Sequence, residues 1–292
     1  MKKIEKKIIE EVPIFKKIKK ISKIDGGITN QNYMVKNQND KNFFVRICKD
    51  IPEHLISRKN EINSSIAASE INVSPKVIFS NNKLIIFEFI KGKTLDEKEV
   101  RGNLIQIIKL LKKVHNQIPT KLKGLPNMFW VFHVINHYKN YLEVNNSQYK
   151  KKLKDLFVKS KKIEKISSPY EIIYGHNDLL AANFIKSQKK LYLVDWEYAG
   201  FNTPLFDLGG LSSNNNFSEK EEILMLENYF DKKITDLLLQ KYYALKTASL
   251  LRETMWSMVA ELISKIDFDY KKYTEENLTR FQKAFKNLDI KN

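Results

Sequence analysis

From residue 175 onward the chain reads Gly175-His176-Asn177-Asp178-Leu179-Leu180-Ala181-Ala182-Asn183, and a second segment follows as Leu193-Val194-Asp195-Trp196-Glu197. Together they place an aspartate, then an amide in the same loop, and then a second aspartate at the end of an apolar run. Transfer of a phosphoryl group from a magnesium nucleotide needs a base for the attacking hydroxyl, followed by two metal ligands. We therefore predict Asp178 as the catalytic base and Asn183 and Asp195 as ligands of Mg²⁺.

The spacing within the first segment supports this prediction. His176, Asp178 and Asn183 match the His-x-Asp-x-x-x-x-Asn order of kinase catalytic loops, and Mg²⁺ prefers hard oxygen ligands of the kind that Asn and Asp supply. Taken singly, Asp178 could cap a turn and Asp195 could end a strand. The ordered trio favours the chemical role. We expect His176 to support the site by holding the loop through hydrogen bonds to the backbone.

The composition is typical of a soluble globular protein, with 42% hydrophobic and 11% aromatic residues among 292. A single cysteine, Cys48, excludes an intrachain disulfide and favours a reducing compartment. The N-terminal residues mix both charges and lack the apolar core of a signal peptide. The longest apolar run, Leu84 to Ile90, contains Glu88 and is too short to span a membrane. We therefore expect a cytoplasmic protein without membrane insertion.

The formal net charge of +17 would suit a non-catalytic scaffold that binds nucleic acid or an anionic membrane. The cations are nearly all Lys and are spread along the whole chain, whereas nucleic-acid sites favour clustered Arg with interleaved aromatic residues. We interpret the charge as a general bias of the composition toward Lys and expect no nucleic-acid partner. A positive field would nevertheless attract an anionic nucleotide. The basic scaffold remains the alternative of another functional class.

Hydrophobic periodicity divides the chain into two unequal units. After an amphipathic lead-in at 2–20, short apolar runs predict strands around one helix at 57–71, which carries Ile62, Ile66 and Ala67 on one face. The predicted fold class is α+β, with a β-rich N-terminal nucleotide-binding unit at 1–91 and a mostly helical catalytic and substrate-binding unit at 92–292. The strands of the first unit are predicted at 31–35, 42–47, 77–79 and 84–90. The helices of the second unit are predicted near 104–114, 129–143, 147–164, 219–230, 233–265 and 274–287, around short strands at 171–174, 183–185 and 191–194.

Two features of the first unit are candidates for binding phosphate. The turn Asp25-Gly26-Gly27-Ile28-Thr29-Asn30 could cradle an anion, because glycine lets backbone N–H groups approach phosphate oxygens closely. Adjacent glycines are also an ordinary turn signal, but this pair lies in the first hairpin, where a kinase covers its nucleotide. Arg46 lies where a kinase carries its phosphate-pairing cation, and Glu61 in the next helix is the expected partner. The alternative is a surface Arg and a solvated Glu.

Several segments along the chain share one resemblance. They are Asp25-Gly26-Gly27-Ile28-Thr29-Asn30-Gln31-Asn32-Tyr33, Phe44-Val45-Arg46, Arg58-Lys59-Asn60-Glu61, Phe87-Glu88-Phe89-Ile90-Lys91-Gly92-Lys93-Thr94-Leu95, the two central segments, and Trp256-Ser257 with Ile263-Ser264-Lys265-Ile266-Asp267-Phe268-Asp269-Tyr270. In them the chain resembles the choline/ethanolamine kinase family, and especially its bacterial choline kinase members. The catalytic-loop segment is shared with aminoglycoside and other small-molecule kinases. Asp195-Trp196-Glu197-Tyr198 and the C-terminal segments point to the choline branch.

The resemblance implies a protein-kinase-like two-lobed fold that phosphorylates choline on its hydroxyl, with ATP and Mg²⁺ as cofactors. It places adenine against Glu88, Phe89 and Ile90. It assigns the role of base to Asp178 and the role of metal ligands to Asn183 and Asp195. It also assigns the phosphate-side ion pair to Arg46 and Glu61. It also assigns Asp207 to bracing the catalytic loop.

The substrate's head group has its own requirements. A quaternary ammonium cannot donate hydrogen bonds, so proteins hold it with aromatic faces. The resemblance places Tyr198 and Trp256 at this cage, with Glu197 nearby as a counter-charge. Glu253, one helical turn from Trp256, stands where many eukaryotic members carry a second aromatic residue. A carboxylate there could pair with choline or favour the primary amine of ethanolamine. Kinases of ethanolamine, thiamine or an aminoglycoside therefore remain alternatives, and no sequence feature indicates an oligomeric state.

Overall fold

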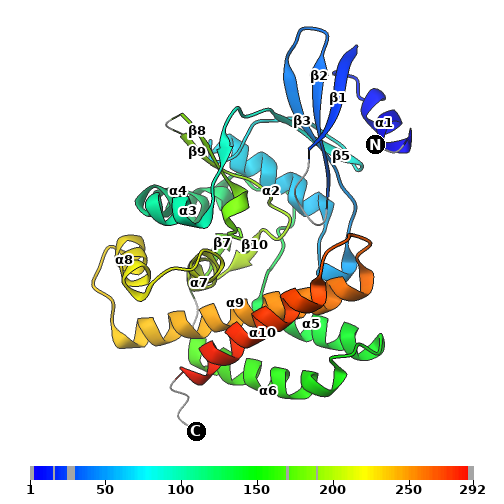
Figure 1. Ribbon diagram of the computed structural model, residues 1–292. Coiled ribbons are helices and arrows are strands. Elements are labelled where there is room, and N and C mark those ends of the chain that lie inside the picture. Colours follow the sequence, from blue (N-terminus) through cyan, green and yellow to red (C-terminus); the bar gives the residue numbers. More distant parts are fainter. Residues whose placement is uncertain (1–2, 16, 25–29, 169–170, 189, 289–292) are drawn as a thin grey trace.

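The computed structural model describes residues 3–288 apart from 16, 25–29, 169–170 and 189. Figure 1 shows a β-rich N-terminal part at the top and a larger, mostly helical C-terminal part below it. The predicted lead-in at 2–20 contains helix α1 (Lys3–Glu10) and the start of strand β1 (Ile18–Ile24), neither of which was predicted as an element.

A five-stranded antiparallel sheet forms the N-terminal part. Its spatial order is β1-β2-β3-β5-β4. Besides β1, the strands are β2 (Gln31–Asn37), β3 (Asn42–Ile47), β4 (Val77–Ser80) and β5 (Leu84–Glu88), which confirms the four predicted strands. Successive side chains of a strand point to opposite faces. Tyr33 and Val45 pack with Ile9 of α1 on one face, whereas Met34 and Arg46 on the other face line the cavity described below.

Helix α2 (Arg58–Glu70) lies below this sheet (Figure 1). Of the residues predicted to share one face, Ile62 and Ile66 are half buried, and Ile62 packs against a cluster of Cys48, Ile85 and Phe87. The buried side chains are charged or small, and include Arg58, Glu61 and the predicted Ala67. The inner face is polar because it carries ion pairs to other elements, and its small residues allow close packing.

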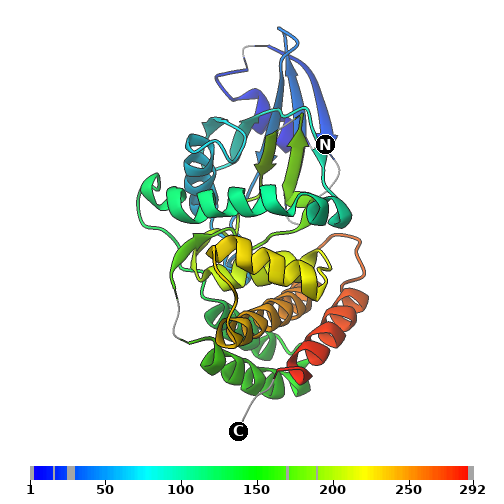
Figure 2. The same cartoon turned by 90° about the vertical axis from the view of Figure 1, so that its left-hand side faces the viewer.

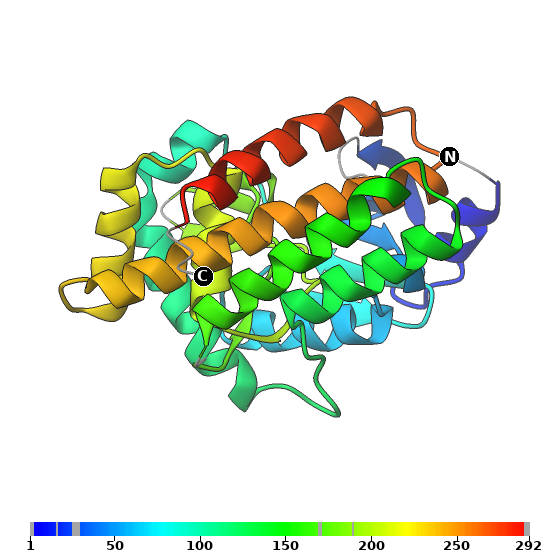
Figure 3. The same ribbon diagram turned by 90° about the horizontal axis from the view of Figure 1, so that it is seen from below.

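The C-terminal part is built around helix α9 (Asp236–Ile263), which is one unbroken helix. Figure 3 shows α5, α6 and α10 running alongside it, and Figure 2 shows α4 lying across the middle of the molecule. The other helices are α3 (Glu97–Gly102), α4 (Leu104–Gln117), α5 (Val131–Val144), α6 (Lys150–Ser167), α7 (Pro204–Asn214), α8 (Glu219–Phe230) and α10 (Tyr270–Lys286). Within the described ranges, no helix has the length and apolar character needed to cross a membrane.

Short strands hold the central motif between the sheet and the helices. Strand β7 (Ile173–Gly175) leads into the motif, and a short 3-10 helix (Ala181–Asn183) closes it. The chain then forms β8 (Phe184–Ser187) and β9 (Lys190–Leu193), which pair with each other and with β6 (Lys93–Thr94). Strand β10 (Gly200–Asn202) pairs with β7. The two aspartates of the motif thus lie in loops that follow β7 and β9.

Helix α7 was not predicted, and its close packing against α9 explains one glycine. A Cβ atom on Gly209 would lie 2.8 Å from the Cα atom of Lys246 in α9, whereas a Cβ atom on the neighbouring Gly210 would meet nothing closer than the Ser249 hydroxyl at 3.5 Å. The backbones of α7 and α9 therefore approach each other at Gly209.

We predict that Gly209→Ala destabilises the protein by about 1–3 kcal/mol, because the backbone of α9 must move away. Gly210→Ala is the matched control and should be neutral or stabilising, since Ala favours a helix over Gly by up to about 1 kcal/mol. Urea unfolding of the two variants measures the difference. Equal stability of the two variants would contradict the close approach.

Candidate active site

A cavity of about 810 Å³ lies between the sheet and the helical part. Its lining includes Glu88 at the end of β5 with the following Phe89 and Ile90, and Trp256 of α9. Alternate side chains of β2 and β3 line it from the sheet side. The other lining residues used below are Arg46, Glu61, Asp178, Asn183, Asp195, Glu197, Tyr198, Arg252, Glu253 and Tyr273.

The predicted catalytic trio meets in this cavity. The side-chain amide of Asn183 donates a 2.8 Å hydrogen bond to the backbone oxygen of Asp178, and the Asn183 backbone oxygen accepts from Val194 N at 2.9 Å. Asn183 thus ties the loop after β7 to the loop after β9. No group of three or more His, Cys, Asp or Glu residues in the described ranges could hold a metal ion. One Asp and one Asn nevertheless fit Mg²⁺, which takes most of its ligands from phosphate and water.

Both loops have unusual backbone at the motif. Asn177 and Asp195 adopt left-handed conformations with φ of 66° and 74°, which non-glycine residues rarely adopt. Tertiary hydrogen bonds hold Asn177 there: its side-chain amide donates to the backbone oxygens of Tyr198 at 3.0 Å and of Gly200 at 3.2 Å. Strain of this kind persists only where surrounding contacts fix it, and it is concentrated at active sites.

Asp207 in α7 anchors the first loop. Its carboxylate accepts hydrogen bonds from the backbone N–H groups of His176 at 2.8 Å and Asn177 at 2.6 Å, and His115 Nε2 lies 3.0 Å away. Burial alone would raise the pKa of Asp207, but its hydrogen bond with His115 and the neighbouring charges lower it below the ordinary value. His176 Nε2 contacts the Val194 backbone oxygen at 3.0 Å. These contacts are those expected of a brace at Asp207 and a structural imidazole at His176.

A chain of buried ion pairs joins the N-terminal sheet to the second aspartate. Arg46 Nη1 lies 2.7 Å from Glu61 and 2.5 Å from Asp195. Arg58 Nη1 lies 2.6 Å from Glu61 and 3.1 Å from Glu197. The structure therefore brings Arg46 and Glu61 together as predicted. It also adds Arg58, whose place three residues before Glu61 on one helix face could have indicated it.

The charged groups in this series of ion pairs shift each other's pKa values. Burial would raise the pKa of Asp195, but Arg46 lowers it below the ordinary value. Burial and the neighbouring Asp195 raise the pKa of Glu197. The side-chain amide of Asn30 donates to Glu197 at 3.0 Å, whereas Gly26, Gly27 and Thr29 lie outside the described residues.

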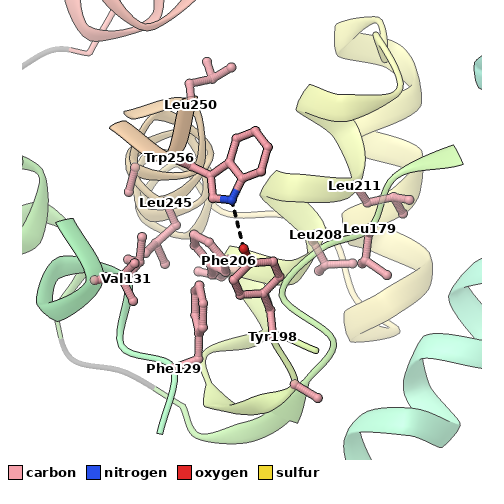
Figure 4. Close-up of a cluster of buried hydrophobic side chains, with 14 of the residues drawn as sticks. Phe129, Val131, Leu179, Tyr198, Phe206, Leu208, Leu211, Leu245, Leu250 and Trp256 are labelled. Carbon is pink, nitrogen blue, oxygen red and sulfur yellow. Dashed lines mark hydrogen bonds between the residues drawn. The ribbon is translucent and has the colours of Figure 1, made fainter. Parts of the chain in front are cut away.

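In the helical part, Trp256 is buried and its indole N–H donates to the Tyr198 hydroxyl at 2.9 Å (Figure 4). Tyr198 and Glu253 line the cavity as predicted. Three other residues here were not predicted: Arg252, Tyr273 and His54. The Tyr273 hydroxyl donates to Glu253 at 2.8 Å, and Arg252 Nη1 lies 2.9 Å from the same carboxylate.

His54 is the last residue of a short 3-10 helix of the N-terminal part (Pro52–His54), just before α2. Its ring stacks on Trp256 with centroids 5.2 Å apart and planes at 24°, and it meets Tyr138 edge to face at 5.7 Å. The side chain is 3% exposed. The sequence held no sign of this contact, because His54 and Trp256 lie far apart in the chain and in different parts of the fold.

Comparison with known proteins decides the family. A family model described as choline/ethanolamine kinase matches residues 21–282. The chain belongs to the choline/ethanolamine kinase family. Protein LicA of Haemophilus influenzae is 26% identical over 211 residues, which cover 70% of this chain and 61% of that protein. A probable ethanolamine kinase A of Dictyostelium discoideum is 27% identical over 307 residues, covering 89% and 84%.

The choline/ethanolamine kinase fold is also seen in solved structures. The crystal structure of choline kinase LicA from Streptococcus pneumoniae matches with a TM-score of 0.81 at 24% identity, covering 98% of this chain and 99% of that one. The predicted kinase-like fold, with a β-rich N-terminal lobe and a helical C-terminal lobe, is confirmed. The family comprises small-molecule kinases, and the relatives include proteins described for both amino alcohols.

The buried imidazole of His54 makes a prediction about stability. Burial, with the nearby Arg252 and His137, lowers the pKa of His54 to about 3. Between about pH 6.5 and pH 3 the unfolded chain therefore binds a proton that the folded chain does not, so acid weakens the fold. His54→Phe keeps a ring against Trp256 but takes up no proton. Between pH 7 and pH 5 the wild type should lose about 2 kcal/mol more than this variant.

Urea unfolding at pH 7, 6 and 5 measures this difference. His133→Gln, at an exposed position of α5, is the control and should keep the pH dependence of the wild type. Parallel curves for the wild type and His54→Phe would show that the imidazole does not stay neutral.

Proposed function

We propose that the protein transfers the γ-phosphoryl group of ATP to the hydroxyl of choline, giving phosphocholine and ADP. The observation that carries this proposal is that one cavity is lined both by Asp178, Asn183 and Asp195 and by the aromatic side chains of Trp256 and Tyr273. The cavity therefore supplies a base and metal ligands for phosphoryl transfer and aromatic rings for binding a quaternary ammonium group.

Asp178 is the proposed base. Burial raises its pKa to about 8, and the Arg252 guanidinium only partly offsets this effect. A general base works best when its pKa lies near the working pH. The carboxylate would orient the choline hydroxyl and accept its proton as the oxygen attacks phosphorus.

Asn183 and Asp195 would hold Mg²⁺, which neutralises and orients the phosphates when bound. Arg46 would pair with phosphate oxygens while Glu61, at 2.7 Å, holds its guanidinium in place. Adenine would lie against Glu88, Phe89 and Ile90, which line the cavity. The loop with Gly26, Gly27, Thr29 and Asn30 would cover the phosphates.

The same geometry supports different functions for the two lobes. We propose that residues 1–91 bind the nucleotide and that residues 92–292 carry catalysis and the acceptor site. The five-stranded sheet ends at Glu88, and the next strand, β6, pairs with β8 of the other lobe. The one cysteine, Cys48, is buried and unpaired, which fits the proposed cytoplasmic location.

Ethanolamine is the second candidate acceptor. Glu253 and Glu197 both line the cavity near Trp256, and a primary ammonium needs such acceptors. The aromatic wall formed by Trp256 and Tyr273 favours choline, because each ring contact contributes about 0.5–2 kcal/mol to the binding of a quaternary ammonium.

Coupled ATP turnover with choline, ethanolamine, thiamine and an aminoglycoside tests the acceptor. We expect the highest kcat/KM with choline and a requirement for Mg²⁺. Turnover with ethanolamine alone would replace the choline proposal, and turnover with none of the four would refute it. Steeply salt-dependent nucleic-acid or vesicle binding without kinase activity would favour the scaffold alternative.

Asp178→Ala tests the base. Loss of base catalysis should lower kcat by about 10²–10⁴-fold, with little change in the KM for ATP. Asp155→Ala, which removes an exposed carboxylate from α6, is the matched control and should behave as the wild type. Near-normal kcat in Asp178→Ala would remove Asp178 from the mechanism.

A further inference from the structure

Arg252 places a permanent positive charge in the part of the cavity where a cationic substrate would bind. The side chain comes from α9, is 4% exposed and lines the cavity. Its Nη1 atom lies 2.9 Å from Glu253 Oε2 and 3.5 Å from Asp178 Oδ1. One guanidinium thus contacts both the proposed base and the carboxylate beside the aromatic wall.

Aromatic rings hold the other side of this guanidinium. Its central carbon lies 4.3 Å from the ring centroid of Tyr198 and 5.7 Å from that of Phe129. The buried Nε and Nη2 atoms have no hydrogen-bond acceptor among the described residues, so the two carboxylates and the rings supply its stabilisation. Tyr198 therefore already holds a cation over its ring, which is the interaction predicted for the substrate.

Two partly buried carboxylates of the cavity depend on this charge. Without Arg252, Asp178 and Glu253 would face the same space as like charges, and an unpaired buried charge is strongly unfavourable. A planar guanidinium contacts both at once, a geometry that a lysine ammonium reproduces less well. The position of the base therefore depends on a residue that follows it by more than seventy positions in the sequence.

The pairing also changes what Glu253 can offer a ligand. Its Oε1 accepts from the Tyr273 hydroxyl at 2.8 Å and its Oε2 from Arg252 at 2.9 Å. Both oxygens are engaged before a substrate arrives, and the negative charge is largely neutralised. A primary ammonium needs hydrogen-bond acceptors, whereas a quaternary ammonium needs rings and no acceptor. The engaged Glu253 thus disfavours ethanolamine more than choline.

We propose that Arg252 is a positioning and specificity-determining residue. It fixes Asp178 for catalysis and, by engaging Glu253, selects a quaternary over a primary ammonium. This role rests on the proposed phosphorylation of an amino alcohol.

The test compares kcat and KM for choline and ethanolamine in variants of the full chain. Arg252→Met keeps an apolar stem against Tyr198 but removes the charge. We expect its kcat with choline to fall about 10–100-fold, because Asp178 loses its partner. We expect its choline-to-ethanolamine ratio of kcat/KM to fall at least about tenfold, because Glu253 becomes available to a primary amine.

Conservative and paired variants separate this role from packing. Arg252→Lys keeps a charge near both carboxylates and should recover part of kcat and most of the ratio. Glu253→Gln alone should change the ratio less than about threefold, and in the double variant with Arg252→Met it should return the ratio toward the wild type. Arg280→Met, which removes an arginine of α10 outside the cavity, is the control and should match the wild type. Arg252→Gln carries the same test if Arg252→Met does not fold.

Each outcome decides between the two proposals. A wild type active on either amino alcohol, with an unchanged ratio in the Arg252 variants, would overturn the role of Arg252 alone. A large shift of the ratio in Glu253→Gln would also overturn it, since Glu253 would then contact the amine directly. A wild type active on neither amino alcohol would overturn the proposed function and, with it, the specificity role.

Discussion

Alternating buried charges hold the two lobes in register, and every proposed function of the site depends on them. Three arginines contact five carboxylates: Arg46 of β3 and Arg58 of α2 contact Glu61, Asp195 and Glu197, and Arg252 of α9 contacts Asp178 and Glu253. Burial makes each pair costly to break, because removal of one partner leaves a charge unsolvated. The network therefore fixes geometry more than it adds stability.

The balance of ionisable groups in this network differs from that of the whole molecule. The chain carries a formal charge of +17, whereas in the network five carboxyl groups face three arginines. A positive field attracts an anionic nucleotide from a distance, while carboxyl oxygens suit a metal ion and a cationic ligand. The net charge of the whole chain and the groups gathered at the cavity thus favour different ligands. Only the structure shows which charged groups lie at the cavity.

The parts of the site that the sequence predicts are those joined by short spacing. Asp178 and Asn183 lie five positions apart, and Asp195 follows β9 closely, so their order alone indicates their chemistry. Arg46 and Glu61 follow from their places on a strand and the adjacent helix. Arg252 and His54 could not be predicted, because their partners are set by how α9 and the short 3-10 helix before α2 pack. Helix α7, buried on all sides, lacks the amphipathic period that marks a surface helix, and α2 turns a polar face inward for its ion pairs. The glycine turn lies outside the described residues, so its role stays a prediction.

The stacking of His54 on Trp256 joins elements from different parts of the fold. His54 lies four positions before Arg58, the first residue of α2, so the imidazole belongs to the N-terminal lobe while the indole belongs to the other. Because both rings are buried, a displacement of the start of α2 relative to α9 would expose apolar ring surface to water. The contact between the two parts of the fold is therefore fixed by ring packing as well as by charge.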